Sequence, residues 1–203
     1  MTGDGTGSRM HTGGANPMPV DEAALRSLVA KAVAADAEAW EHLYRRSYPR
    51  LFAYARRRLS SDTAADDAVS ETMLRALDRI SGFTWQGAGF DAWLYGILRN
   101  VVLEAYRTDG RVTPTGTLPE QLDNGATGPL DTLVRRDDHD QVRAAFRCLS
   151  SDDQEVLELR VVAGLSADGV AEATGRGAGA VRMAQSRAIQ RLRGHYEGLG
   201  RAD

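Results

Sequence analysis

Residues 149–193, LSSDDQEVLELRVVAGLSADGVAEATGRGAGAVRMAQSRAIQRLR, determine how the second half of the chain folds. Ser151 and Gln154 have the spacing of a capping box, which predicts the start of a helix. A second short helix is predicted from Ser166, as its N-cap, to Gly175, and a third follows immediately. Two short helices joined by a glycine-containing turn are typical of a helix-turn-helix.

Positive charge is concentrated in the last of these helices. Residues 131–172 contain five arginines and ten acidic residues, whereas residues 173–203 contain six arginines and two acidic residues. No Asp or Glu occurs between Glu172 and Glu197. Residues 176–193 therefore contain no acidic residue that could pair with these arginines within the helix, as a solvated surface helix would. The pattern favours contact with DNA phosphates and groove edges.

The composition is that of a folded chain without disulfides. The 203 residues are 42% hydrophobic and 26% charged, with 25 basic and 28 acidic side chains. Cys148 is the only cysteine, so no intrachain disulfide can form, and a zinc site would depend on four scattered histidines. Residues 1–20 lack the apolar core of a signal peptide, and no apolar run could span a membrane. We expect a disordered leader, a cytoplasmic protein and a start at Met1, Met10 or Met18.

Composition also divides the chain into parts. Residues 21–107 are rich in helix-forming residues and contain all three tryptophans, and residues 131–197 are helical in pattern again. Residues 108–130 between them contain three prolines and four glycines, which predicts a flexible linker. Residues 198–203 form a short tail. No stretch alternates like a strand, so we predict an all-α fold of two small helical domains.

The apolar spacing in the first domain predicts four helices. They cover residues 21–36, 36–59, 62–80 and 90–107. Asp62 is the expected N-cap of the third helix. The loop before the fourth helix carries Trp85 between glycines.

Four motifs in this order resemble the extracytoplasmic-function (ECF) sigma factors, which are initiation subunits of bacterial RNA polymerase. DDAVSETMLRAL, residues 66–77, is similar to that family's core-binding segment. FDAWLYGILRNVVLEAYR, residues 90–107, is similar to its promoter-melting helix. Residues 149–175 and AVRMAQSRAIQRLR, residues 180–193, are similar to its C-terminal module.

Some residues depart from the family's usual pattern. Ser70 replaces a glutamine and Gly96 replaces an arginine. Gly169 lies within the first helix of the helix-turn-helix, where glycine costs about 1 kcal/mol relative to alanine. GAGAVRMAQSRA replaces the commoner GTVKSRLHRA.

The resemblance implies a sigma factor that directs core polymerase to promoters and helps to melt them. Residues 21–107 would be the region 2 domain, which binds core polymerase and the −10 element, and residues 131–197 the region 4 domain, which binds the −35 element. The implied partners are the clamp of the polymerase β′ subunit, the flap of the β subunit, promoter DNA and an anti-sigma factor. No cofactor, catalytic residue, metal ligand or membrane insertion is implied.

Three sets of candidate site residues follow from the resemblance and from the chemistry that each task needs. Reading a duplex needs arginine and amide side chains on a helix in the major groove. The −35 candidates are Arg176, Arg182, Gln185, Ser186, Arg187, Gln190, Arg191 and Arg193, the last two as phosphate contacts. Capture of a single strand needs a stacking surface and a pocket for an extruded base. The −10 candidates are Trp85, Gln86, Arg99 and Asn100, and the core-polymerase candidates are Asp67, Ser70, Glu71 and Arg75.

Other interpretations remain open from the sequence. Trp85 could instead be a core residue that closes the first domain. Asp67 could instead stabilise its helix by a favourable interaction with the positive N-terminal end of the helix dipole, whereas Glu71 lies too far along the helix for that. A dimeric operator-binding regulator would need a dimerisation or ligand domain, and residues 21–107 show no βα alternation. An enzyme has little support, since there is no phosphate-binding loop and no metal-spaced His/Cys cluster.

Overall fold

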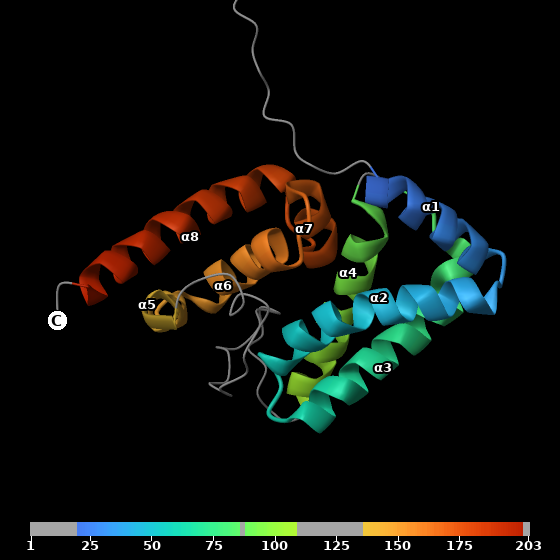
Figure 1. The fold of residues 1–203 in the computed structure, drawn as a ribbon, viewed down its shortest axis with the longest axis horizontal. Coiled ribbons are helices and arrows are strands. Elements are labelled where there is room, and N and C mark those ends of the chain that lie inside the picture. Colours follow the sequence, from blue (N-terminus) through green and yellow to red (C-terminus); the bar gives the residue numbers. More distant parts are fainter. Residues whose placement is uncertain (1–19, 86–87, 109–135, 201–203) are drawn as a thin grey trace, which may run out of the picture.

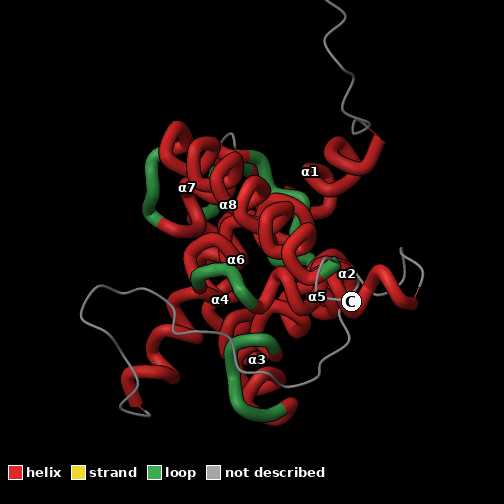
Figure 2. The backbone as a smooth tube through the Cα atoms, turned by 90° about the vertical axis from the view of Figure 1, so that its left-hand side faces the viewer, coloured by secondary structure: helices red, strands yellow, loops and turns green. Residues whose placement is uncertain are grey.

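The computed structural model describes residues 20–85, 88–108 and 136–200. This part of the chain is helical and contains no strand, which confirms the all-α prediction (Figures 1 and 2). The predicted leader, except Val20, and most of the predicted linker lie outside the described residues. The elements are α1 (Val20–Val33), α2 (Ala37–Arg56), α3 (Asp62–Arg79), η1 (Ile80–Gly82), α4 (Gly89–Thr108), α5 (Arg136–Arg147), α6 (Ser151–Leu157), η3 (Glu158–Val162), α7 (Ala167–Thr174) and α8 (Ala178–Leu199).

The first four helices, here called the N-terminal half, pack around a common apolar core. α2 lies against α1 and α3, and α4 lies against α3 and α2. Leu43, Val69, Phe90 and Leu98 are completely buried where these helices meet. The four helices predicted from the apolar spacing are therefore present and close on one core.

The remaining helices, α5 to α8, form the C-terminal half. The long helix α8 lies against α5, α6 and α7 (Figure 1). Leu149, Leu157 and Ala188 form a small buried cluster there, with Phe146 and Leu192 packed against it. α8 continues to Leu199, two residues beyond the boundary predicted for this domain.

The helix caps agree with the sequence in part. Ser166 Oγ accepts a hydrogen bond from the Gly169 N–H at 3.0 Å, and Gly175 ends α7 with φ of 72°, as predicted for a glycine C-cap. The cap of α3 differs, because Ser61 Oγ accepts from the Ala64 N–H at 3.0 Å. Asp62 instead pairs with Arg56.

The expected capping box at the start of α6 is also wrong by one residue. Ser150, and not Ser151, is the N-cap, since its Oγ accepts from the Asp153 N–H. Gln154 does not take part in a capping box. Its Nε2 donates instead to the carbonyl oxygens of Phe146 and Leu149, at 3.0 and 3.1 Å. The amide therefore satisfies carbonyls at the end of α5 and joins that helix to α6.

The two halves share one apolar core, which the composition does not predict. α4 lies directly against α7 (Figure 1). Leu159, Leu165, Val170 and Val181 belong to the same buried cluster as the core residues of the N-terminal half. The helix-turn-helix is therefore docked on α4 in this structure.

The corrected cap of α3 can be tested by substitution. Ser61→Ala removes the acceptor for the Ala64 N–H, so we expect it to lower the free energy of unfolding by about 1 kcal/mol. Ser60→Ala, one residue earlier and also exposed, should change it by less than about 0.5 kcal/mol. Urea denaturation of both variants measures this, and equal effects would show that Ser61 is not the cap.

Candidate nucleic-acid interface

The helix-turn-helix is formed by α7, the turn at Gly175 and α8. The positive φ of Gly175 reverses the chain, and α8 begins after Gly177, which is its N-cap. In the first half of α8, Val181 is buried in the core shared with the N-terminal half, and Ala188 is buried in the smaller cluster of the C-terminal half. The opposite side of the helix is therefore the one that can enter a groove.

The candidate −35 residues on α8 fall into two groups. The side chains of Arg182, Ser186, Arg187, Gln190 and Arg193 are exposed. No carboxylate within the described part of the chain pairs with these three arginines. Arg182 and Ser186 lie one turn apart on the same face, as expected. The exposed side chains of this first group form a cationic edge along α8.

The other candidate −35 residues are already held by side chains of α6 and η3. Arg176 Nη2 lies 2.8 Å from Asp152 Oδ1, and Arg191 pairs with Asp153. Gln185 Oε1 accepts a hydrogen bond from Arg160 Nε at 2.8 Å. The prediction that these arginines lack acidic partners is therefore wrong for Arg176 and Arg191. Their partners, Asp152 and Asp153, come from another helix, α6, and not from the basic helix itself.

Trp85 is half-buried in the turn between η1 and α4. Its ring lies edge-on to Phe83, with 6.1 Å between the ring centroids, and the Arg26 guanidinium lies 4.7 Å from its ring centroid. Gly89 has φ of 73°, and a Cβ there would lie 3.3 Å from the indole. Trp85 therefore packs partly into the core while part of the side chain remains accessible. Gln86 lies outside the described residues.

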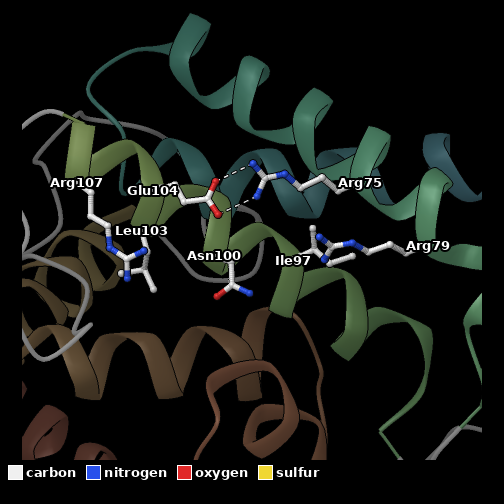
Figure 3. Close-up of a pocket in the computed structure, with 7 residues that line it drawn as sticks. All are labelled: Arg75, Arg79, Ile97, Asn100, Leu103, Glu104 and Arg107. Carbon is white, nitrogen blue, oxygen red and sulfur yellow. Dashed lines mark hydrogen bonds and ion pairs between the residues drawn. The ribbon is translucent and has the colours of Figure 1, made fainter.

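Arg99 and Asn100 point to different sides of α4. Arg99 Nε donates to Glu155 Oε1 at 3.0 Å, and its side chain is only 13% exposed. Asn100 is exposed and lies at a cavity of about 230 Å³ between α3 and α4 (Figure 3). The cavity is lined by Arg75, Arg79, Ile97, Asn100, Leu103, Glu104 and Arg107.

The wall of this cavity is positively charged. Arg75 donates two hydrogen bonds to the Glu104 carboxylate, at 2.9 and 2.7 Å, and one to Glu71 at 2.6 Å (Figure 3). These bonds, first to Glu104 and then to Glu71, raise the pKa of Arg75, and the bond from Arg75 lowers the pKa of Glu104. Arg79 and Arg107 are exposed beside this network. The site can attract an anionic strand next to Asn100.

The surface of α3 carries the candidate polymerase-binding residues. Asp67 and Ser70 are exposed, whereas Glu71 and Arg75 are tied together. Sequence reasoning missed Leu74 and Leu77, whose side chains are 59% and 46% exposed on the same helix. Leu74 and Leu77 lie about one turn apart, and neighbouring exposed apolar side chains make this face a candidate interaction surface. Their spacing from Ser70, at four and seven residues, was the available signal.

Comparisons with known proteins match both halves of the chain. The Sigma-70 region 2 model matches residues 43–112, and the Sigma-70 region 4 model matches residues 145–194. The chain is 36% identical to the ECF RNA polymerase sigma factor SigD of Mycobacterium tuberculosis, over 87% of this chain and 85% of SigD. The chain belongs to the ECF sigma factors.

Solved structures support the same fold. The structure of CnrH with the cytosolic domain of CnrY matches with a TM-score of 0.60 and 24% identity, over 89% of this chain and 99% of CnrH. The sigma factor RpoE, solved with the anti-sigma factor NepR from Bartonella quintana, matches with a TM-score of 0.50 and 22% identity, over 87% and 96%. At these identities the likeness establishes the fold alone.

The family match confirms that this sigma factor directs RNA polymerase to promoters, as the sequence predicts. The basic helix α8 lies in region 4, and α3 and α4 lie in region 2. Within the described residues, no group of three or more His, Cys, Asp or Glu side chains could hold a metal ion. None of the described helices is long and apolar enough to cross a membrane.

Proposed function

We propose that this sigma factor reads the −35 duplex with α8, holds the −10 strand at the α3–α4 cavity, and assists promoter melting in complex with core polymerase. The observation that supports this most is the exposed edge of Arg182, Ser186 and Arg187 in the first half of α8. Arginine side chains at this end of a recognition helix reach base edges in the major groove.

Within α8 the arginines have different tasks. Arg182 and Arg187 lie in the half that enters the groove, and they discriminate between bases. Arg193 lies two to three turns further along the helix and meets the phosphate backbone, which carries no sequence information. The exposed side chain of Gln190 lies between these regions.

The −10 element is held by region 2 as a single strand. Asn100 hydrogen-bonds a base that enters the cavity, and Arg79 and Arg107 attract the phosphates on either side. The accessible part of the Trp85 ring offers a stacking surface near the start of α4. Holding an unstacked strand in this way lowers the free energy of the melted promoter, which is how the protein assists melting.

The α3 surface binds the clamp of the polymerase β′ subunit. It combines an acidic edge at Asp67 with the exposed apolar side chains of Leu74 and Leu77. A few apolar anchors among polar contacts form the usual energetic centre of a protein interface. Region 4 contacts the flap of the β subunit, and the protein acts in the cytoplasm.

An anti-sigma protein regulates this factor. The sigma factor RpoE was solved with an anti-sigma factor, and this chain shares its fold. Purification of the tagged protein from its native cells should yield a complex with a third protein besides the free and polymerase-bound forms.

The polymerase assignment predicts the effect of two substitutions on α3. Asp67→Arg and Leu77→Ser should each weaken binding to core polymerase by about tenfold, the effect of losing one interface anchor. Both side chains are exposed, so unfolding should change by less than about 0.5 kcal/mol. Glu38→Arg, the same charge reversal at an exposed residue of α2, is the control. Equal affinity for core polymerase in all three variants would refute the assignment.

The promoter assignment predicts two kinds of arginine in α8. Arg182→Ala should reduce discrimination at one −35 position by roughly 1–3 kcal/mol. Arg193→Ala should weaken binding to all promoters evenly, and it should reduce the slope of log affinity against log salt concentration by about one. The measurement is holoenzyme binding to a panel of −35 variants at two salt concentrations. If both substitutions scaled every variant by one factor, α8 would be a phosphate clamp and not a reader.

A further inference from the structure

Met183 is an apolar residue at the centre of the exposed face of α8. It is 63% exposed, the highest value among the large apolar residues that the structure describes. Successive residues of an α-helix are rotated by about 100°, so Met183 lies about 200° around the helix from Val181. Val181 is completely buried and holds α8 against the core. The side chain of Met183 therefore points away from the protein.

The neighbours of Met183 on α8 are two arginines and two small residues. Arg182 and Arg187 flank it, about 100° to one side and about 40° to the other. Gly179 and Ala180 lie one turn earlier and are exposed, and a Cβ on Gly179 would meet nothing within 4 Å. Side chains of a helix lean toward its N-terminus, so the Met183 side chain lies over these small residues. Together they form a small apolar patch between two cations.

Packing within the protein does not require a methionine at this position. The buried stripe of α8 is supplied by Val181 and Ala188, and the exposed side of such a helix ordinarily carries polar residues. A single exposed apolar residue is common on protein surfaces, so exposure alone decides nothing. The flanking arginines decide the kind of partner. Neither Arg182 nor Arg187 pairs with a carboxylate in the described part of the chain, so the face suits a polyanion with an apolar group at its centre.

Duplex DNA presents such an apolar group in its major groove. Base edges there carry hydrogen-bond donors and acceptors, except for the C5-methyl group of thymine. The methionine thioether is only a weak acceptor, so it cannot replace the water that it would displace from a polar base edge. Its unbranched, flexible side chain can follow the position of a methyl group. A methionine in this place therefore favours thymine over the other bases.

We propose that Met183 is a specificity-determining residue of the −35 site and that it contacts the C5-methyl group of a thymine. This proposal rests on the proposed function of α8 as the −35 reader and adds the base class that one of its residues selects. Arg182 and Arg187 bind phosphates and polar base edges, whereas Met183 reads the methyl group. Because Met183 carries no charge, its contribution does not depend on counterion release.

Deoxyuridine tests this contact, because it differs from thymidine only by the missing methyl group. The probe is a promoter duplex that the holoenzyme selects from a pool randomised at the −35 and −10 elements. Each thymine of the selected −35 element, on either strand, is replaced in turn by deoxyuridine. We expect the wild-type holoenzyme to lose about fourfold in affinity at one thymine, the contribution of one buried methyl group. Met183→Ala should bind the thymine and deoxyuridine duplexes equally at that position.

Two controls separate this contact from a general effect on the protein. Val161→Ala removes an apolar side chain of similar exposure, 59%, from η3, and it should keep the full sensitivity to the missing methyl group. Met183 is exposed and alanine favours helices, so Met183→Ala should unfold at the same temperature as the wild type. The slope of log affinity against log salt concentration should also be the same for these two proteins.

The outcomes distinguish this proposal from the proposed function. The proposal is overturned if the selected −35 element contains no thymine, or if no deoxyuridine weakens binding by the wild type. It is also overturned if Met183→Ala retains the same loss at every thymine. In each case the proposed function stands as long as scrambling the selected −35 element weakens binding. If scrambling had no effect, α8 would not read the −35 element, and the proposed function would fail together with this inference.

Discussion

The buried contact of Glu155 and Glu158 with arginines of the N-terminal half is the constraint on which the arrangement of the two halves depends. Each carboxylate is enclosed, so the surfaces that the two halves bury against each other are shielded from water while the halves are docked. Burial is the largest single influence on Arg58 and opposes its charge, but the combined attraction of Glu158, Tyr54 and Glu155 outweighs it and raises the pKa of Arg58. Burial also raises the pKa of Tyr54, which remains a hydrogen-bond donor to Glu155.

The docked structure leaves one functional surface accessible while it withholds another. Asp67, Leu74 and Leu77 on α3 are exposed, so the proposed polymerase surface is accessible in the docked structure. Arg99 is held by Glu155 of the C-terminal half, whereas Arg176 is held by Asp152 and Glu155 of its own half.

Local signals in the sequence predicted the helices and the helix-turn-helix, because apolar spacing and caps such as Ser166 and Gly175 act over a few residues. These signals did not predict docking of the two halves, because Tyr54 and Glu155 are 101 residues apart. The sequence pattern also does not distinguish a buried acidic residue in a helix from a solvent-exposed one. Arg99 and Asn100 show the same limit. They are neighbours in the sequence, but the approach of α6 and α7 gives them different environments.

The central claim concerns the distance between the two halves, which can be measured in solution. Spin labels at His42→Cys on α2 and His195→Cys on α8, both exposed positions, fit a Cys148→Ser background. Double electron–electron resonance should give one narrow distance distribution for the free chain, because the buried ion pairs hold the two halves together. A broad distribution for the free chain would contradict this account.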